Sequence, residues 1–172
     1  MLVGIKMIVE VGFKLDKKLK FYHNMLLKHG LKLVFKTQTH DLYFTKADCF
    51  DNLTENQIKN SCVRIRNPKD NKEETELLQS GYKKVFDTTK LDYHYANASM
   101  KSRIQLQQIE KLGLVAYYDN PDYYNYSLDK QRKCLIDELN SYGFNFDYDK
   151  LGIDKLRTLY YGKEMFSKNQ NG

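Results

Sequence analysis

The stretch Cys62-Val63-Arg64-Ile65-Arg66 alternates apolar and basic residues over its last four positions. In a β-strand successive side chains point to opposite faces, so Val63 and Ile65 share one face and Arg64 and Arg66 share the other. Atoms two residues apart on a strand lie about 7 Å apart, which is the predicted spacing of the two guanidinium groups. The residues that follow, NPKDN at 67–71, are typical of a turn. The sequence therefore predicts a strand over 62–66 with one apolar face and one basic face.

A second alternating segment lies near the start of the chain, at 6–15. Glu10, Gly12 and Lys14 fall on one face of this predicted strand, together with Ile8. The opposite face carries the apolar residues Val9, Val11, Phe13 and Leu15. Further strands are predicted at 42–44 and within 77–86.

Helix-like segments that end at glycine and lead into a short strand occur three times. In the first of them, Leu15, Leu19, Tyr22 and Leu26 form an apolar stripe with the helical period. A glycine just past a helix supplies the left-handed conformation that closes the last turn. We therefore expect three such units: 16–29 with Gly30 and 31–35, 99–112 with Gly113 and 114–118, and 127–142 with Gly143 and 144–148.

In chain order the predicted elements are a strand, a helix, several antiparallel strands, a helix, a strand, a helix and a strand. This order is typical of an α+β fold with a mostly antiparallel sheet flanked by about three helices. The length of 172 residues corresponds to one domain. We expect this single domain to span 1–162 and the polar segment 163–172 to form a flexible C-terminal tail.

The chain carries 28 Lys and Arg against 22 Asp and Glu, a formal net charge of +6. A positive field attracts anions, but no block of consecutive basic residues occurs, so nucleic acid is a weaker expectation than a small phosphate-rich ligand. No apolar run reaches the ~18 residues of a membrane-spanning helix, and no secretory cleavage site follows the apolar start. Three cysteines without paired spacing favour a reducing compartment. We therefore expect a cytoplasmic protein with no membrane partner.

Two sets of charged side chains could carry chemistry. Arg64 and Arg66 can each bind phosphate oxygens bidentately, and their spacing suits adjacent phosphates of one polyphosphate. On the strand at 6–15, the carboxylate of Glu10 could hold a divalent cation and Lys14 could neutralise phosphate charge. The same residues also fit simpler roles: an exposed strand face for the arginines, and a cross-strand salt bridge for Glu10 and Lys14.

Together these segments resemble the CYTH superfamily, also called the triphosphate tunnel metalloenzymes. The resemblance rests on 10–15, the helix after it, 41–44 (DLYF) and 63–66 (VRIR), and on the C-terminal stretch from 141–144 (SYGF) to 155–160 (KLRTLY). The superfamily includes class IV adenylate cyclases, thiamine triphosphatases and inorganic triphosphatases. The resemblance implies that the antiparallel sheet curls into a tunnel, as a half or full barrel. Inward basic residues would hold a triphosphate, and inward acids would hold one or two Mg²⁺ or Mn²⁺ ions.

The resemblance also implies roles for individual residues. Arg64, Arg66, Lys14 and Lys83 would bind the substrate, with Lys84 as the alternative to Lys83. Glu10 would be the metal ligand, and Glu10 and Lys14 would be the catalytic residues.

The first strand of the family carries two acids and a lysine at alternate positions, and this chain matches it in two registers. In one, Glu10 is the first acid, Gly12 replaces the second acid and Lys14 is the lysine. In the other, Ile8 replaces the first acid and Gly12 replaces the lysine. Both registers keep the same face of the strand inward.

The implied function is binding of a nucleotide or polyphosphate-type anion in a basic β-tunnel. If the chain is an enzyme, the implied reaction is metal-dependent triphosphate hydrolysis or nucleotide cyclisation, as in a triphosphatase or a class IV adenylate cyclase. The alternative is a catalytically inactive CYTH-like scaffold that binds a protein partner or sequesters a phosphate ligand. The sequence leaves the oligomeric state open, a dimer included.

Overall fold

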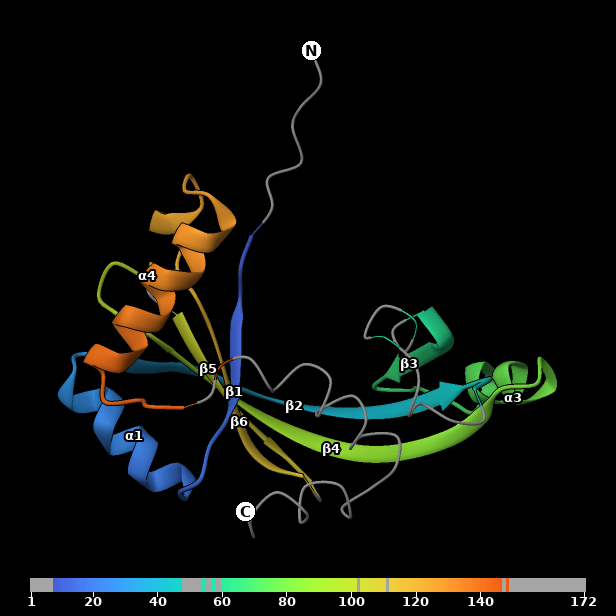
Figure 1. Cartoon of the computed structure of the whole chain (residues 1–172). Helices are drawn as coiled ribbons and strands as arrows, with labels where there is room; N and C mark the ends of the chain where they lie inside the picture. The colour runs from blue at the N-terminus through green and yellow to red at the C-terminus, as the bar shows by residue number, and fades with distance from the viewer. Residues whose placement is uncertain are drawn as a thin grey trace, which may run out of the picture. The chain divides into compact units, whose positions relative to one another are not determined.

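The computed structural model of the chain describes residues 8–47, 54, 57, 60–101, 103–110, 112–146 and 148 (Figure 1). The chain divides into two compact units. Unit 1 comprises Met1–Thr37, Asp92–Gln108 and Leu114–Asp149, and unit 2 comprises Gln38–Leu91, Ile109–Gly113 and Lys150–Gly172. The elements are β1 (Val11–Lys14), α1 (Leu19–Lys28), β2 (Lys32–Thr45), β3 (Cys62–Arg66), α3 (Lys72–Gln79), β4 (Lys83–Ala96), β5 (Arg103–Ile109), β6 (Gly113–Asp119), the 3₁₀ turn η1 (Pro121–Tyr123) and α4 (Leu128–Ser141).

The described strands form one sheet of six, in the order β1-β6-β5-β4-β2-β3. β1 is antiparallel to β6, with Val11 opposite Tyr118, and β2 is antiparallel to β3, with Asp41 opposite Arg66. The links from β4 to β5 and from β5 to β6 are too short for a parallel crossover. Within the described residues β1 and β3 are the two edges, so the sheet is open, as in a half barrel. The predicted α+β class with an antiparallel sheet is confirmed.

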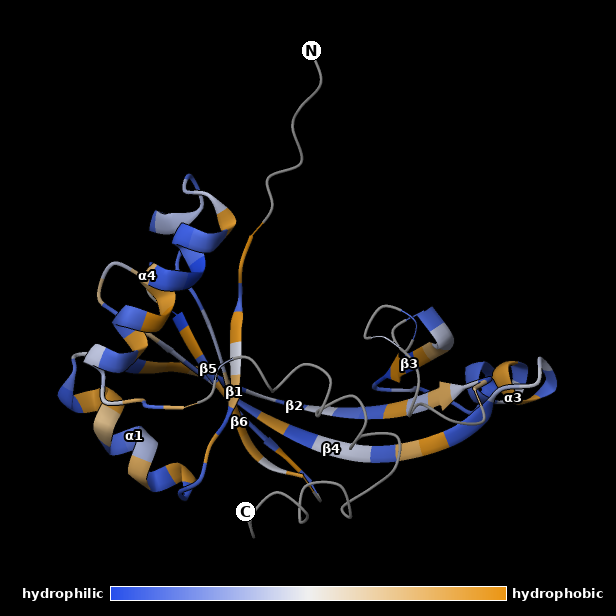
Figure 2. Ribbon diagram, viewed as in Figure 1, coloured by the Kyte–Doolittle hydropathy of each residue, from blue (hydrophilic) through white to orange (hydrophobic). Residues whose placement is uncertain are grey.

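The core of unit 1 lies between one face of its strands and the helices α1 and α4 (Figure 1). On β1, Val11 and Phe13 are buried whereas Gly12 and Lys14 are half-buried, which confirms the two predicted faces. Hydrophobic and hydrophilic residues are interspersed along both helices (Figure 2). The helices contribute Tyr22, Leu26, Leu135 and Leu139 to the core, and the other strands contribute Tyr95, Ile104, Leu106, Leu114, Ala116 and Tyr118.

The two helices of unit 1 end as the glycine pattern predicts. After α4, the Gly143 N–H donates to the carbonyl of Asn140 at 3.0 Å and the Phe144 N–H donates to the carbonyl of Leu139 at 3.1 Å. This is the Schellman arrangement, which needs the left-handed backbone that Gly143 adopts at a φ of 92°. Leu139 and Phe144 both lie in the core, so the cap also packs an apolar pair.

The prediction of a strand at 144–148 is wrong at its first three positions. Phe144, Asn145 and Phe146 belong to no strand. The rings of Phe144 and Phe146 instead pack on Phe13, at centroid distances of 5.1 and 5.4 Å. The alternation of aromatic residues here reflects docking onto the core, and no strand among the described residues pairs with 144–146.

The helix predicted over 99–112 is also wrong, because 103–109 forms β5. Ile104 and Leu106 are buried on one face, and Gln105 between them is half-buried. Gly113, at a φ of 105°, begins β6 after a tight connection and closes no helix. Pairing of β5 between β4 and β6 outweighs the high helix propensity of the Gln, Leu, Glu and Lys residues in this segment.

The strands predicted at 31–35 and 42–44 are parts of one long strand, β2, because no glycine or proline interrupts 36–41. The strand predicted within 77–86 begins only at Lys83, where β4 starts. Residues 72–79 form α3, which the sequence analysis missed. The count of about three helices is therefore confirmed for the described residues, with α3 in place of the helix expected at 99–112.

Unit 2 holds small apolar clusters on the two faces of β2 and β3. Leu42, Phe44 and Ile65 are buried on one face, where Val63, Leu77 and Tyr82 pack against them. Tyr43 lies on the other face, with Cys62, Val85 and Phe86 among its neighbours. Across the part of the chain that the structure describes, no helix has the length and hydrophobicity needed to span a membrane.

Candidate functional site

In unit 2 the pairing of β2 with β3 brings a charged cluster onto one strand face. Asp41 lies opposite Arg66, and Tyr43 lies opposite Arg64. Because Leu42 and Ile65 occupy the intervening positions and face the apolar side, all four polar side chains project to the other face. The predicted separation of Arg64 and Arg66 from Val63 and Ile65 is confirmed.

Asp41 is the centre of this cluster and is fully buried. Its carboxylate accepts from Arg66 through Nε at 3.0 Å and Nη2 at 3.3 Å, a bidentate contact. Lys90 of β4 donates to Oδ2 at 2.6 Å, and Arg64 Nη1 lies 4.0 Å from the same oxygen. Lys90 also donates to the Tyr43 hydroxyl, which donates to Asp41 at 3.3 Å. Among the described residues, one carboxylate thus holds three cationic side chains.

Exposure differs sharply between the members of this cluster. The side chain of Lys90 is 2% exposed, whereas those of Arg64 and Arg66 are 48% and 45% exposed. Burial on its own would raise the pKa of Asp41, but the hydrogen bonds from Arg66 and Lys90 outweigh it and hold the pKa below its ordinary value. Asp41 therefore stays ionised. It holds the Arg66 guanidinium through two hydrogen bonds and attracts that of Arg64 from 4.0 Å, while both arginine side chains stay partly exposed.

Lys90 and the role of Asp41 were not predicted from the sequence. Thr88, Lys90 and Asp92 are buried at alternate positions of β4. This polar alternation was the signal available in the sequence, but the strand was expected to lie within 77–86.

Lys83 lies at the start of β4 and is exposed. Its spacing from Lys90 is odd, so a regular strand points the two side chains to opposite faces. Lys84, the alternative candidate, binds Glu74 at 3.2 Å and Asp87 at 3.4 Å. Neither lysine has a contact with Asp41 among those that the structure describes.

Glu10 and Lys14 belong to unit 1: Lys14 lies on the face of β1 that points away from the core, and Glu10 directly precedes β1. Lys14 is half-buried, and burial lowers its pKa. Glu10 is exposed and lines a pocket of about 360 Å³. The predicted site residues therefore divide between the units: Glu10 and Lys14 in unit 1, and Arg64, Arg66 and Lys83 in unit 2.

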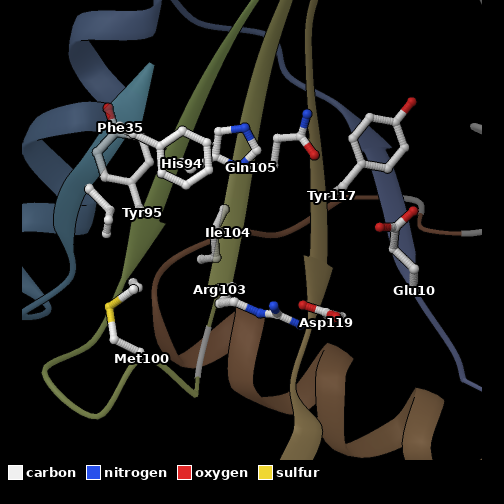
Figure 3. A pocket seen from close by; sticks show the side chains of 12 residues that line it. Glu10, Phe35, His94, Tyr95, Met100, Arg103, Ile104, Gln105, Tyr117 and Asp119 are labelled. Atoms are coloured by element: carbon white, nitrogen blue, oxygen red, sulfur yellow. Dashed lines mark hydrogen bonds and ion pairs between the residues drawn. The ribbon is translucent and has the colours of Figure 1, made fainter. Parts of the chain in front are cut away.

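The pocket of unit 1 is built on the face of the strands opposite the helices. Figure 3 shows Phe35, His94, Gln105, Tyr117 and Glu10 in a row that follows the strand order β2, β4, β5, β6 and the segment before β1. The remaining lining residues include Val34, Met100, Arg103 and Asp119.

Two sets of contacts between side chains hold the walls of this pocket in place. The rings of Phe35 and His94 are stacked, with centroids 4.0 Å apart and planes 16° from parallel. Arg103 Nη2 donates to Asp119 Oδ2 at 2.7 Å, and the Tyr124 hydroxyl donates to the same oxygen at 2.6 Å. Arg103 and Gln105 were missed in the sequence because 103–109 was expected to be part of a helix, and His94 because the strand now seen as β4 was expected to lie within 77–86.

The acids of this pocket do not match the metal site that the family resemblance implies. Mg²⁺ binds oxygen ligands in a near-octahedral arrangement, and carboxylates supply them best. Asp119 is already bound by Arg103 and Tyr124, and Gly12 stands where a second acid would be needed beside Glu10. Within the described residues no three His, Cys, Asp or Glu side chains converge as metal ligands. These residues therefore do not fit a divalent cation held by protein ligands alone.

The antiparallel sheet with its helices defines the fold class, and comparison with known proteins narrows it. The sequence matches no model of a protein family and no curated protein. The fold, however, is similar to that of the PH1012 protein from Pyrococcus horikoshii, with a TM-score of 0.57, 15% identity and coverage of 86% of this chain and 98% of that one.

Two candidate adenylate cyclases have similar structures. The one from Vibrio parahaemolyticus matches with a TM-score of 0.51 and 14% identity, over 85% of this chain and 97% of that one. The one from Bacillus halodurans matches with a TM-score of 0.50 and 9% identity, over 85% and 96%. The chain has a divergent CYTH-like fold, as the sequence resemblance predicted.

Proposed function

We propose that unit 2 binds a phosphate-rich anion, such as a nucleoside triphosphate or inorganic triphosphate, at the face formed by Arg64, Arg66 and Lys90. The observation that carries this proposal is the pair of half-exposed arginine side chains whose guanidinium groups lie within 4.0 Å of one buried carboxylate. Arginine presents planar donors that match phosphate oxygens bidentately.

Asp41 prepares these side chains for a ligand. A flexible side chain loses rotamer freedom when it binds, at a cost of about 0.5–1.5 kcal/mol. The bidentate contact of Asp41 with Arg66 has already restricted that side chain before any ligand arrives. Arg64 makes a looser contact with Asp41, at 4.0 Å, so its guanidinium keeps more donor capacity for phosphate.

The fold supports a nucleotide as the ligand to test first. Two of the similar structures carry the name adenylate cyclase, so adenine nucleotides head the panel. The acids of unit 1 fit a protein-held metal poorly, which favours binding over metal-dependent hydrolysis or cyclisation. Release of phosphate from ATP and inorganic triphosphate, and of pyrophosphate from ATP, is measured with and without Mg²⁺ or Mn²⁺. The first product reports hydrolysis and the second cyclisation, and turnover that requires metal would establish an enzyme.

Calorimetric titration of ATP and inorganic triphosphate into the wild type and Arg64→Ala tests the binding proposal. A hydrogen bond to a charged group contributes ~1.5–3 kcal/mol, so we expect affinity to fall about tenfold or more. Higher salt should weaken binding further, because it screens the charges. Arg66→Lys, which keeps a cation beside Asp41, should give a smaller loss.

Lys133→Ala is the matched control. Lys133 is an exposed cation on α4 whose partner is Asp137, so its removal changes the net charge equally. Affinity that falls as much in Lys133→Ala as in Arg64→Ala would show a non-specific charge effect and contradict the proposal. Unchanged affinity in Arg64→Ala would also contradict the proposal.

A catalytically inactive scaffold for a protein partner is the second candidate. It predicts that replacing both arginines leaves partner binding intact. Loss of triphosphate binding together with retained partner binding would assign two separate roles.

A further inference from the structure

The positive charge of the chain is concentrated in one segment, 17–40. This segment holds six of the 28 Lys and Arg and none of the 22 Asp and Glu. The rest of the chain is therefore formally neutral, and 17–40 carries the whole net charge of +6. It comprises α1 and the first part of β2, and its six lysines all belong to unit 1. Charge of one sign on one surface attracts a partner of the opposite sign.

The lysines of this segment are open to a partner. All six are exposed: Lys17, Lys18, Lys20, Lys28, Lys32 and Lys36. Within the described residues none of them forms an ion pair with a carboxylate. The ammonium groups of Lys17 and Lys36 lie over the rings of Phe21 and Tyr93, at 5.3 and 4.9 Å. Carboxylates of a partner would therefore meet cations that no described acid neutralises.

The same segment carries much of the exposed apolar surface. Among the described residues, five of the ten exposed large hydrophobic side chains lie in it, namely Phe21, Leu27, Leu33, Val34 and Phe35. Three of these five are consecutive on β2, so apolar side chains are exposed on both faces of the strand. Single exposed apolar residues are ordinary, but a group of them beside unpaired charges is typical of an interaction surface.

The first part of β2 is an open strand edge. β3 pairs with β2 only at Asp41–Thr45, and no described strand lies on this side of 32–37. The N–H of His40 donates to the Asn67 side chain at 2.8 Å, and its carbonyl accepts from the Asn67 N–H at 2.7 Å. Both backbone groups of His40 thus point to the side of β3. The alternation of a regular strand then points the backbone groups of Lys32, Val34 and Lys36 to the same, open side.

An open strand edge selects the class of partner. Lipid headgroups and nucleic acid could bind the lysines, but only a polypeptide offers N–H and C=O groups at the spacing that pairs with a strand. A second copy of this chain would bring lysines against lysines, and like charges across a strand pair are destabilising. The charge and the open edge together therefore favour an acidic polypeptide.

We propose that an acidic, extended segment of a partner protein adds a strand to the open edge of β2 at 32–37. Phe35 stacks on His94 whereas Lys36 lies over Tyr93, so successive side chains of β2 occupy opposite faces. Acids at alternate positions of the partner meet Lys32 and Lys36, and the apolar residues between them pack on Leu33 and Phe35. The inference gives the second candidate function a surface and a class of partner, and it does not depend on the anion site of unit 2.

A short peptide tests this inference on the full chain. The probe is acetyl-Glu-Val-Glu-Val-Glu-Val-amide, followed by amide chemical shifts and hydrogen exchange. We expect the amides of Lys32, Val34 and Lys36 to exchange rapidly in the free chain and to become protected by the peptide. The control peptide has proline in place of each valine. It keeps the three carboxylates but cannot form a strand, so it should bind much more weakly.

Charge reversal tests the role of the two lysines. Lys32→Glu combined with Lys36→Glu should weaken peptide binding about tenfold or more, because two attractions become repulsions. A peptide with lysine in place of glutamate should prefer this double variant to the wild type. Lys130→Glu combined with Lys133→Glu is the matched control, because both lysines are exposed on α4 and the change in net charge is equal.

Val34→Pro tests the pairing of the backbone. It removes an N–H that points to the open side, where a strand tolerates proline, so we expect a folded protein that no longer binds the peptide. Circular dichroism checks the fold. The double lysine variant decides the question if Val34→Pro does not fold.

Several outcomes would overturn the inference. These are amides of Lys32, Val34 and Lys36 that are already protected in the free chain, no change in them at about 1 mM peptide, or equal losses in the two double variants. Tighter binding of an oligonucleotide or of anionic vesicles than of the peptide, equal binding of the proline peptide, and dimerisation of the chain through 32–37 would also reject it.

Arg64→Ala separates this inference from the anion site, because it should leave peptide binding unchanged. If the peptide binds while triphosphate affinity does not depend on Arg64, the proposal for unit 2 fails and this one stands. The reverse pattern rejects this one alone.

Discussion

The buried carboxylate of Asp41 determines how the arginine face of unit 2 is held. Lys90 is almost as buried, and Asp41 is the acid that it contacts among the described residues. Removing one partner of a buried ion pair leaves the other charge without compensation, which commonly costs about 3–5 kcal/mol. We therefore expect Asp41→Asn to lower the free energy of unfolding by several kcal/mol, measured by urea denaturation.

Asp87→Asn is the control for this substitution. Asp87 also contacts basic side chains, His40 at 2.5 Å and Lys84 at 3.4 Å, but it is 48% exposed. Exposed ion pairs contribute about 0–1 kcal/mol, so the control should unfold almost like the wild type. Equal effects of the two substitutions would show that Asp41 does not stabilise unit 2 as a buried ion pair.

The lowered pKa of Asp41 predicts that the free energy of unfolding depends on pH. The pKa of Asp41 in the folded state lies below its ordinary value, because the hydrogen bonds from Arg66 and Lys90 outweigh burial. A carboxyl group with a lowered folded-state pKa stabilises the protein above its ordinary pKa of about 4, and this stabilisation is lost as the pH falls through the lowered value. Stability curves of the wild type and Asp41→Asn should therefore converge in acid.

The helix α4 is tied to the end of β6 and to η1 through Glu138. The carboxylate of this residue accepts from the hydroxyls of Tyr142 at 2.7 Å and Tyr123 at 2.9 Å, and from Asn120 at 3.0 Å. Burial alone would raise the pKa of Glu138, but these hydrogen bonds, together with one from Tyr118, hold it below the ordinary value. The ionised form therefore fixes α4 on unit 1.

We expect Glu138→Gln to destabilise the protein by about 1.5–3 kcal/mol, since hydrogen bonds to a charged acceptor weaken when the charge is removed. The loss should be clear at neutral pH and shrink in acid, where Glu138 of the wild type becomes protonated. Thermal unfolding followed by circular dichroism measures it. Asp137→Asn changes the adjacent, exposed acid of α4, and a loss as large as that of Glu138→Gln would contradict the prediction.

The two compact units of the chain differ in how much apolar surface they bury. Unit 1 has a continuous core that joins both of its helices to the sheet. In unit 2 the described residues form smaller clusters, around Tyr43 and around Leu42, Phe44 and Ile65, and α3 has no buried residue. Because local stability follows buried apolar contacts, unit 2 should open more readily than unit 1.

Native-state hydrogen exchange tests this difference across the chain. We expect the amides of β5 and β6 to be more protected than those of β3 and α3, after correction for intrinsic exchange rates. Saturating triphosphate should raise protection in β3 if the arginine face binds it. Equal protection in both units without ligand would contradict the expected difference in stability.

The sequence by itself determined which face of a strand a side chain occupies and where two of the helices end, because these features depend only on neighbouring residues. Alternation placed Val11 and Phe13 inside and put Arg64 and Arg66 on one face of β3, because the strand period allows no other arrangement. Gly30 and Gly143 marked the ends of α1 and α4, because few other residues adopt a left-handed backbone at low cost. The α+β class followed from the order of such elements.

The tertiary structure decided what depends on partners distant in the chain. Residues 103–109 have high helix propensity, yet pairing with β4 and β6 makes them a strand and turns Arg103 and Gln105 into pocket residues. Lys90 joined Asp41 across a separation of 49 residues. A side-chain period describes which face a residue occupies but not which strand lies beside it. Strand pairing therefore assembled the residues of the arginine face within unit 2 and, separately, the residues of the pocket within unit 1.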